Sequence, residues 1–185
     1  MTLFNKKTIR KLLLGTACAV ALTFAHSAYA AEAKPLNDLE IAHSAYTADV
    51  IDINYAKVAL QKTTNPEIKT FANLMIQDHS AVNEGASALL KKLGVEAKDN
   101  DFSKALNKGA DAKLAEYAKL SGKSFDLAYA ENELAYHQTV NKTVEGWIPT
   151  IQNAELKTFM ENALVTFKVH EGHAANMVAQ LKASK

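Results

Sequence analysis

Apolar residues recur every three or four positions along four long segments of this chain, which is the period of α-helices that bury one face. The first segment runs from about Asp38 to Thr63. The second begins with Asn65 as an N-cap and Pro66 in the first turn, and Gly94 follows its last apolar residue as a C-terminal glycine does. The pattern therefore predicts an all-α protein.

The other two long segments form a second pair. The third begins at Gly122 and Ser124 and ends at Pro149, and the fourth runs from about Asn153 to Lys182. Between the pairs, residues 95–122 are rich in Lys and Asp, and the pattern there predicts a short helix around 110–120. Two helical hairpins joined by a long crossover with a short helix describe a ferritin-like four-helix bundle.

A weak internal repeat supports the division into two hairpins. The segment NPEIKTF at 65–71 matches NAELKTF at 153–159 in five of seven positions. Each copy opens the second helix of a predicted hairpin. The repeat therefore indicates that the two hairpins are built alike.

The first thirty residues resemble a cleavable secretory signal peptide. Four basic residues precede an apolar run from Leu12 to Ala25, and Ala28-Tyr29-Ala30 has the small-x-small pattern of a cleavage site. We therefore predict cleavage after Ala30 and export to a bacterial periplasm. Residues 31–37 would then be a linker, and 38–182 the bundle.

Removal of the signal segment changes the charge of the chain. The segment carries four basic residues and no acidic one, so the formal net charge goes from +1 to −3. It also contains the only cysteine, Cys18, and the only arginine, Arg10. The mature chain then has no disulfide, and its charge and lack of arginine argue against nucleic-acid binding. No transmembrane span is expected after cleavage.

The candidate chemistry rests on histidines and carboxylates that lie on the apolar stripes. Asp52 and His79 are equally far from the predicted turn between Asn65 and Pro66, and Glu133 and His170 are nearly equally far from a turn near Ile151. Partners at equal distance from a turn share one layer of an antiparallel hairpin. His, Asp and Glu converging inside a helical bundle are the usual ligands of a metal site. The candidate ligands of one transition-metal ion are His79, His137, His170, Asp52 and Glu133.

Other interpretations of these residues stay open. A buried hydrogen-bonded network with the tyrosines Tyr46, Tyr55, Tyr129 and Tyr136 would also accommodate the histidines. In that case the chain would be a non-catalytic envelope or stress protein that binds a protein partner or forms a homodimer. An oxidase or catalase-like enzyme with a di-metal centre is a third interpretation, while motifs for nucleophilic catalysis are absent from the mature chain.

Several stretches resemble a known family. They are ALQKTTNPEIKTFA at 59–72, MIQDH at 75–79, LSGKSFDLAY at 120–129 with the following His137, and finally His170. Together they resemble a bacterial domain-of-unknown-function family of exported ferritin-like bundles, often labelled as candidate outer-membrane proteins. The resemblance covers about 36–181 and implies a fold without an established activity.

A comparison with ferritins bears on the number of ions. Their di-iron sites use Glu-x-x-His on the second helix of each hairpin. Here Ile76 and Phe167 stand three residues before His79 and His170. Two carboxylates and two imidazoles balance little of the charge of two iron ions, so the sequence favours a single ion or a lost site.

Overall fold

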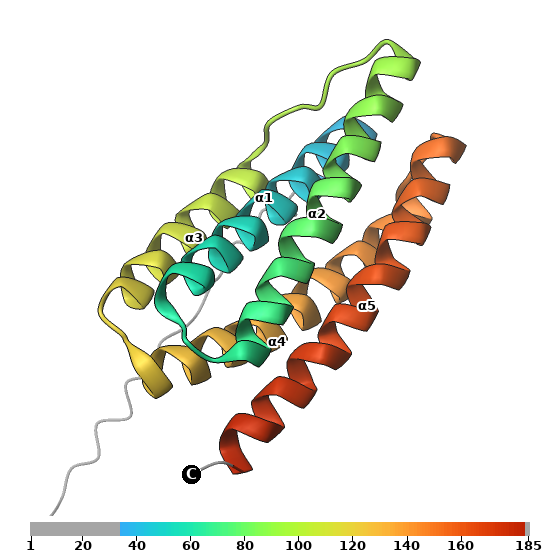
Figure 1. Ribbon diagram of the computed structural model, residues 1–185. Helices are drawn as coiled ribbons and strands as arrows, with labels where there is room; N and C mark the ends of the chain where they lie inside the picture. Colours follow the sequence, from blue (N-terminus) through green and yellow to red (C-terminus); the bar gives the residue numbers. More distant parts are fainter. Residues whose placement is uncertain (1–33, 184–185) are drawn as a thin grey trace, which may run out of the picture. The chain divides into compact units, whose positions relative to one another are not determined.

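Helices account for most of residues 34–183, the part of the chain that the computed structural model describes (Figure 1). In chain order the elements are α1 (Asp38–Lys62), α2 (Pro66–Leu93), α3 (Asp101–Ala118), α4 (Gly122–Trp147), the short 3-10 helix η1 (Ile148–Thr150) and α5 (Ala154–Ala183). The prediction of an all-α bundle is confirmed, and the bounds of the four long helices agree with the sequence pattern. The ferritin-like assignment stays a prediction. The predicted signal peptide, residues 1–30, lies outside the described residues.

The polar residues that begin the helices explain these bounds. The side chain of Asn37 accepts hydrogen bonds from the backbone N–H groups of Leu39 and Glu40, and the Glu40 carboxylate accepts one from the Asn37 N–H. This reciprocal arrangement is a capping box, which satisfies donors that a helix start leaves unpaired. At the C-terminus of the first hairpin, Gly94 ends α2 with φ of 66°, a backbone conformation that favours glycine.

The repeated heptapeptides occupy equivalent places in the two hairpins. The Asn65 side chain accepts a hydrogen bond from the backbone N–H of Ile68, and the Asn153 side chain accepts one from the N–H of Leu156. Each asparagine thus caps the helix that returns after a hairpin turn, α2 in one case and α5 in the other. The sequence repeat is therefore a repeated helix start.

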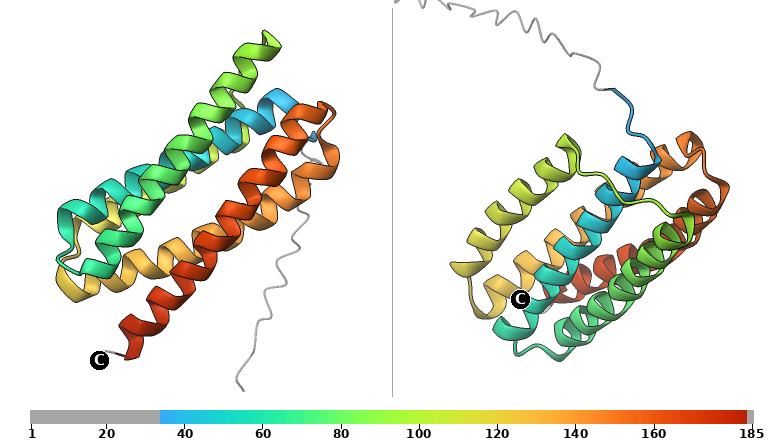
Figure 2. Two further views of the ribbon diagram at one scale, coloured as in Figure 1. Left: turned by 45° about the vertical axis from the view of Figure 1, so that its right-hand side comes forward. Right: turned by 90° about the horizontal axis from the view of Figure 1, so that it is seen from above.

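The connection between the hairpins is more helical than the sequence suggested. The short helix expected around 110–120 is in fact α3, which has 18 residues and begins at Asp101. Its start is set by Asn100 and Ser103, whose side chains cap each other's backbone N–H groups. Asn100 also donates to the Glu40 carbonyl and the Ser44 hydroxyl of α1. α3 therefore lies beside α1 (Figures 1 and 2).

The core of the bundle contains two apolar clusters. The aromatic cluster includes Tyr55, Phe71, Tyr117, Phe125 and Tyr129. The aliphatic cluster includes Ile41, Val144, Ile151, Leu156, Met160 and Leu164. On α1, α2, α4 and α5 the predicted ligand positions lie between residues of the two clusters. No helix within residues 34–183 is long and apolar enough to cross a membrane.

Candidate metal centre

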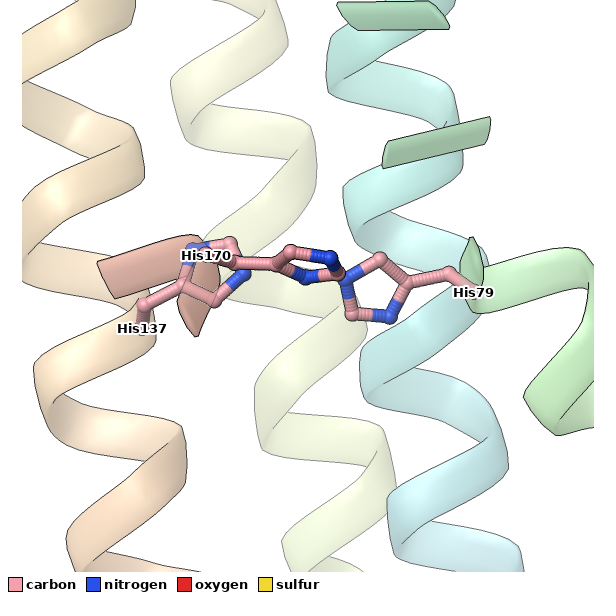
Figure 3. Close-up of side chains that lie close together, drawn as sticks. All are labelled: His79, His137 and His170. Atoms are coloured by element: carbon pink, nitrogen blue, oxygen red, sulfur yellow. The ribbon is translucent and has the colours of Figure 1, made fainter. Parts of the chain in front are cut away.

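The five residues proposed as ligands come from four helices and are all buried. Asp52 lies on α1, His79 on α2, Glu133 and His137 on α4, and His170 on α5, and none is more than 3% exposed. They form two overlapping groups, His79–His137–His170 and Asp52–Glu133–His137, and within each the candidate ligand atoms lie within 4.8 Å of one another. Figure 3 shows the three imidazoles pointing toward one another from different helices.

His79 is held between two carboxylates of α1. Its Nδ1 lies 2.7 Å from Asp49 Oδ1 in a hydrogen bond, and its Nε2 lies 2.9 Å from Asp52 Oδ2. The pairing of Asp52 with His79 is the one the hairpin spacing suggested. Asp49 was missed by the sequence analysis, although its place three residues before Asp52 puts it on the same helix face.

His137 and His170 are each held by one ring nitrogen. His137 Nδ1 donates to the backbone carbonyl of Glu133 at 2.9 Å, so this nitrogen carries the proton of the neutral ring. His170 Nε2 lies 2.9 Å from Asp78 Oδ2. The sequence spacing suggested Glu133 as the facing partner of His170, but the carboxylate in contact is that of Asp78 on α2. In the sequence, the only sign that Asp78 belongs to the centre is that it directly precedes His79.

The remaining nitrogen of each ring is turned to the interior. His79 Nε2, His137 Nε2 and His170 Nδ1 are buried without a hydrogen-bond partner among the described residues, and so are both carboxylate oxygens of Asp52 and of Glu133. Asp52 Oδ2 lies 3.4 Å from His137 Nε2 as well as 2.9 Å from His79 Nε2, but neither contact has the directions of a hydrogen bond. His79 Nε2 and Asp52 Oδ2 form an ion pair, whereas the inner nitrogens of His137 and His170 have no hydrogen-bond partner among the described residues, which costs free energy unless something binds them.

Aromatic rings fix the histidines in place. The ring of Phe167 stacks on that of His79, with centroids 5.0 Å apart and planes 10° apart. The centroids of the three imidazoles are 5.1 to 5.7 Å from one another. In the predicted ferritin-like register, Phe167 is one of the two residues that stand at the position of a motif glutamate. Its ring fills that place with an apolar surface.

Asp52 and His79 form the charged part of the centre. Burial by itself lowers the pKa of His79, but the charges and contacts of Asp52 and Asp49 outweigh it and raise the pKa to about 10. Burial likewise opposes ionisation of Asp52, yet the neighbouring His79 and His137 lower its pKa. Burial raises the pKa of Asp49 to about 6, although His79 acts in the opposite direction. A protonated His79 beside an ionised Asp52 follows at neutral pH.

The other three groups are neutral. Burial, and then the charge of Asp52, raise the pKa of Glu133 well above its usual value. Burial lowers the pKa of His137, and the charge of His79 adds to this effect while Asp52 opposes it. Burial also lowers the pKa of His170, to about 4, although its hydrogen bond to Asp78 acts in the opposite direction. The centre therefore contains free imidazole nitrogens that can donate electron pairs to a metal.

The tyrosines do not complete a hydrogen-bonded network with the histidines. Tyr136 donates to the backbone carbonyl of Ala48 instead, at 2.9 Å, and Tyr46 is exposed. The hydroxyl groups of Tyr117 and Tyr129 are buried and have no partner in the described part of the chain. The network interpretation requires every buried group to be satisfied, and here it is not.

The sequence of residues 23–177 matches the family described as "Domain of unknown function (DUF4142)". The chain belongs to this family. The match spans the predicted ligands, and the family description states no activity. No curated protein matches the sequence.

Two solved structures resemble the DUF4142 bundle. One is a DUF305 protein from Streptomyces coelicolor, named as a candidate secreted protein. The two structures align with a TM-score of 0.67 and 12% sequence identity, over 78% of this chain and 93% of the other. The other is CopM in a Cu(II)-bound form, with a TM-score of 0.60 and 14% identity, covering 78% of this chain and 97% of its own. At these identities the likeness concerns the fold alone.

Proposed function

We propose that the mature chain is a periplasmic, ferritin-like bundle that binds one transition-metal ion. The ligands are His79, His137 and His170 with Asp52 and Glu133. The observation that carries the proposal is the position of Asp52 Oδ2, which lies 2.9 Å from His79 Nε2 and 3.4 Å from His137 Nε2. His79 would release its Nε2 proton when the ion binds, as metal-ligating histidines do. Two ligand atoms at about 2.1 Å from one ion are about 3.0 to 3.4 Å apart for octahedral to tetrahedral angles. Each of these two distances is therefore close to the separation of two ligand atoms that share an ion.

The outer contacts of the rings support the same proposal. In metal-binding histidines, the N–H of the second ring nitrogen usually donates a hydrogen bond to a carboxylate or a backbone carbonyl, which fixes the ring and its tautomer. Here the second nitrogens contact Asp49, the Glu133 carbonyl and Asp78. The inner nitrogens of His137 and His170 are left free as ligands, and that of His79 becomes available when its proton is released on metal binding.

The charge and the space favour a single ion. When Glu133 loses its proton on metal binding, Asp52 and Glu133 together neutralise one divalent cation, whereas two ions would leave an uncompensated buried charge. Phe167 occupies one place where a di-iron site would have a glutamate. Imidazole-rich sites suit zinc, copper, iron and nickel. The Cu(II)-bound form of CopM, which has a similar fold, makes copper one of the ions to test first.

The test is metal analysis of the mature chain after incubation with Cu(II), Zn(II), Fe(II) or Mn(II) and removal of unbound ion. We expect about one equivalent of one of these ions in the wild type. The His79→Ala/His170→Ala double variant should retain none. His173→Ala is the matched control, because His173 lies one turn beyond His170 on α5 but is exposed. It should retain the wild-type amount.

A second readout guards against misfolding of the double variant. An ion that binds only the folded chain stabilises it by about 2.7 kcal/mol at a hundred times its dissociation constant. We therefore expect the same ion to raise the melting temperature of the wild type and of His173→Ala. Equal metal content in the wild type and the double variant, with no shift in melting, overturns the proposal. The histidines would then be structural.

The alternative function is that of a non-catalytic interaction protein. One observation favours it: Val165 and Val169 are exposed by 66% and 51%, one turn apart on α5. Val165 and Val169 can each be replaced by cysteine. Cross-linking through these cysteines would capture a partner or a second copy that binds this face. The metal analysis above is independent of that outcome.

A further inference from the structure

A long cavity runs along the side of the bundle where α3 lies. It has a volume of about 440 Å³ and is bounded mainly by α1, α3 and α4. Small side chains leave this space open: Ala45 and Ala48 on α1, Ala105 and Gly109 on α3, and Ala135 on α4. A volume of this size is within the range of sites for small molecules.

The cavity is elongated. Its lining on α4 extends from Asn132 to Trp147, which is about 22 Å at 1.5 Å per residue. Its lining on α3 extends from Phe102 to Lys113. The same volume in a compact shape would suit a ring system, whereas this length suits an extended chain.

One end of the cavity offers hydrogen-bond donors. Lys113 and Asn132 are the lining residues of α3 and α4 that are nearest the turn at 119–121. The Asn132 amide nitrogen has no hydrogen-bond partner among residues 34–183, and it lies just beneath the cavity wall, so a small turn of the side chain would bring it to a ligand. Lys113 contacts Glu116 at 2.7 Å, and the two side chains are 30% and 50% exposed. Such a surface ion pair contributes little, so the ammonium group can exchange Glu116 for another anion.

The opposite end is apolar. The rings of Phe102 and Trp147 meet edge to face there, with centroids 5.2 Å apart, and Val144 lies beside them. Asp49 is the one acidic residue of the lining, and its carboxylate already contacts His79. The hydroxyl groups of Ser44, Thr139 and Thr143, which also line the cavity, donate to backbone carbonyls of their own helices. The cavity therefore combines a cationic end with a remainder that is predominantly apolar.

We infer that this cavity binds a long-chain fatty acid. The carboxylate lies at Lys113 and Asn132, and the hydrocarbon chain extends past Ala48 and Gly109 toward Phe102 and Trp147. Burial of the chain supplies the affinity, at roughly 0.8 kcal/mol for each buried methylene group, and the two donors set the orientation. This site does not depend on a metal ion.

Trp147 is the only tryptophan of the chain, so its fluorescence reports on the apolar end of the cavity. The experiment is a titration of the chelator-treated mature chain with palmitate, below the concentration at which palmitate forms micelles. We expect a saturable change with one palmitate per chain. Hexadecanol, which lacks the charge, should bind more weakly, and acetate should not bind.

Two glycine variants locate the site. A Cβ atom at Gly109 would meet no atom within 4 Å, and the same holds for Gly172 on α5, so neither backbone position obstructs a larger side chain. Leucine also has the better helix propensity. Gly109→Leu fills the cavity and should weaken palmitate binding by about tenfold or more. Gly172→Leu lies outside this cavity and should bind as the wild type does.

A third variant tests the orientation. Lys113→Gln should weaken the binding of palmitate several-fold and leave that of hexadecanol unchanged. The inference is overturned if palmitate causes no saturable change, or if Gly109→Leu and Gly172→Leu bind it equally. Binding of palmitate by Lys113→Gln with wild-type affinity overturns the assigned position of the carboxylate.

Discussion

The two hairpins contribute to the buried centre in different ways. In the α1–α2 hairpin, His79 contacts two carboxylates of its own hairpin, Asp49 and Asp52. In the α4–α5 hairpin, His170 turns away to Asp78 of the other hairpin, and Glu133 has no hydrogen-bond partner for its carboxylate within the described residues. One hairpin thus carries an ion pair and the other a neutral acid. Similar spacing in sequence gave unequal electrostatics, because Asp49 and Asp78 have no counterparts in the second hairpin.

The largest effect on stability is expected for Asp52→Asn. The substitution removes the ionised partner of a buried, protonated His79, and breaking such a pair costs about 3 kcal/mol. Chemical denaturation of the metal-free chain measures the change. Asp111→Asn is the control, since Asp111 is exposed on α3 and should change the free energy of unfolding by less than about 0.5 kcal/mol. Equal stability of the two variants would show that the ion pair contributes nothing.

The second prediction concerns the pH dependence of the metal-free chain. The pKa of His79 is raised from its ordinary 6.5 to about 10, so the folded chain holds a proton that the unfolded chain has lost. The stability from this proton is complete below pH 6.5 and is lost as the pH rises through 10. Melting temperatures should therefore fall over this range. His79→Gln should remove most of that slope, and an unchanged slope would contradict the charged state assigned to His79.

A third, smaller effect on stability is expected to differ in sign between Tyr136 and Tyr117. Tyr136→Phe removes the hydrogen bond to the Ala48 carbonyl and should cost about 1 kcal/mol. Tyr117→Phe removes a buried hydroxyl group that has no partner in the described part of the chain, so it should be neutral or stabilise by up to about 1 kcal/mol. Thermal unfolding of the two variants side by side gives the sign of each effect. A destabilised Tyr117→Phe would mean that its hydroxyl group is satisfied in solution.

The smallest effect on stability is expected for Glu133→Gln. Burial and the charge of Asp52 raise the pKa of Glu133 well above its usual value, so the metal-free chain exchanges one neutral side chain for another of the same shape. We expect a change within about 0.5 kcal/mol. Metal binding should respond differently, because the variant lacks the carboxylate needed to balance a divalent ion. Unchanged metal affinity would remove Glu133 from the ligand set.

Much of the fold could be predicted because its signals are local. Asn65, Pro66 and Gly94 mark the limits of α2, and the apolar period fixes the buried face of each long helix. The contact between Asp52 and His79 followed from counting residues on either side of one hairpin turn. These inferences need only helix geometry and an antiparallel arrangement.

The rest depended on contacts between distant segments. The full length of α3 was missed because the segment is polar and buries only Ser103, Ala110 and Tyr117. Its first turn is fixed by Asn100 and Ser103 and by contacts of Asn100 with α1. The partner of His170 was missed because counting within one hairpin cannot place Asp78, which reaches it from the other. Side-chain contacts across the hairpins depend on rotation and tilt, which the apolar period does not specify.

The contact between Asp78 and His170 also has a consequence for the order of folding. Each hairpin can form from residues close together in the chain, and such local contacts form rapidly. The buried centre requires both hairpins, because Asp52 and His79 come from one and Glu133, His137 and His170 from the other. We therefore expect it to be among the last features to form. An ion bound there would link the two folded hairpins. It would lower the rate at which they separate more than it raises the rate at which they dock.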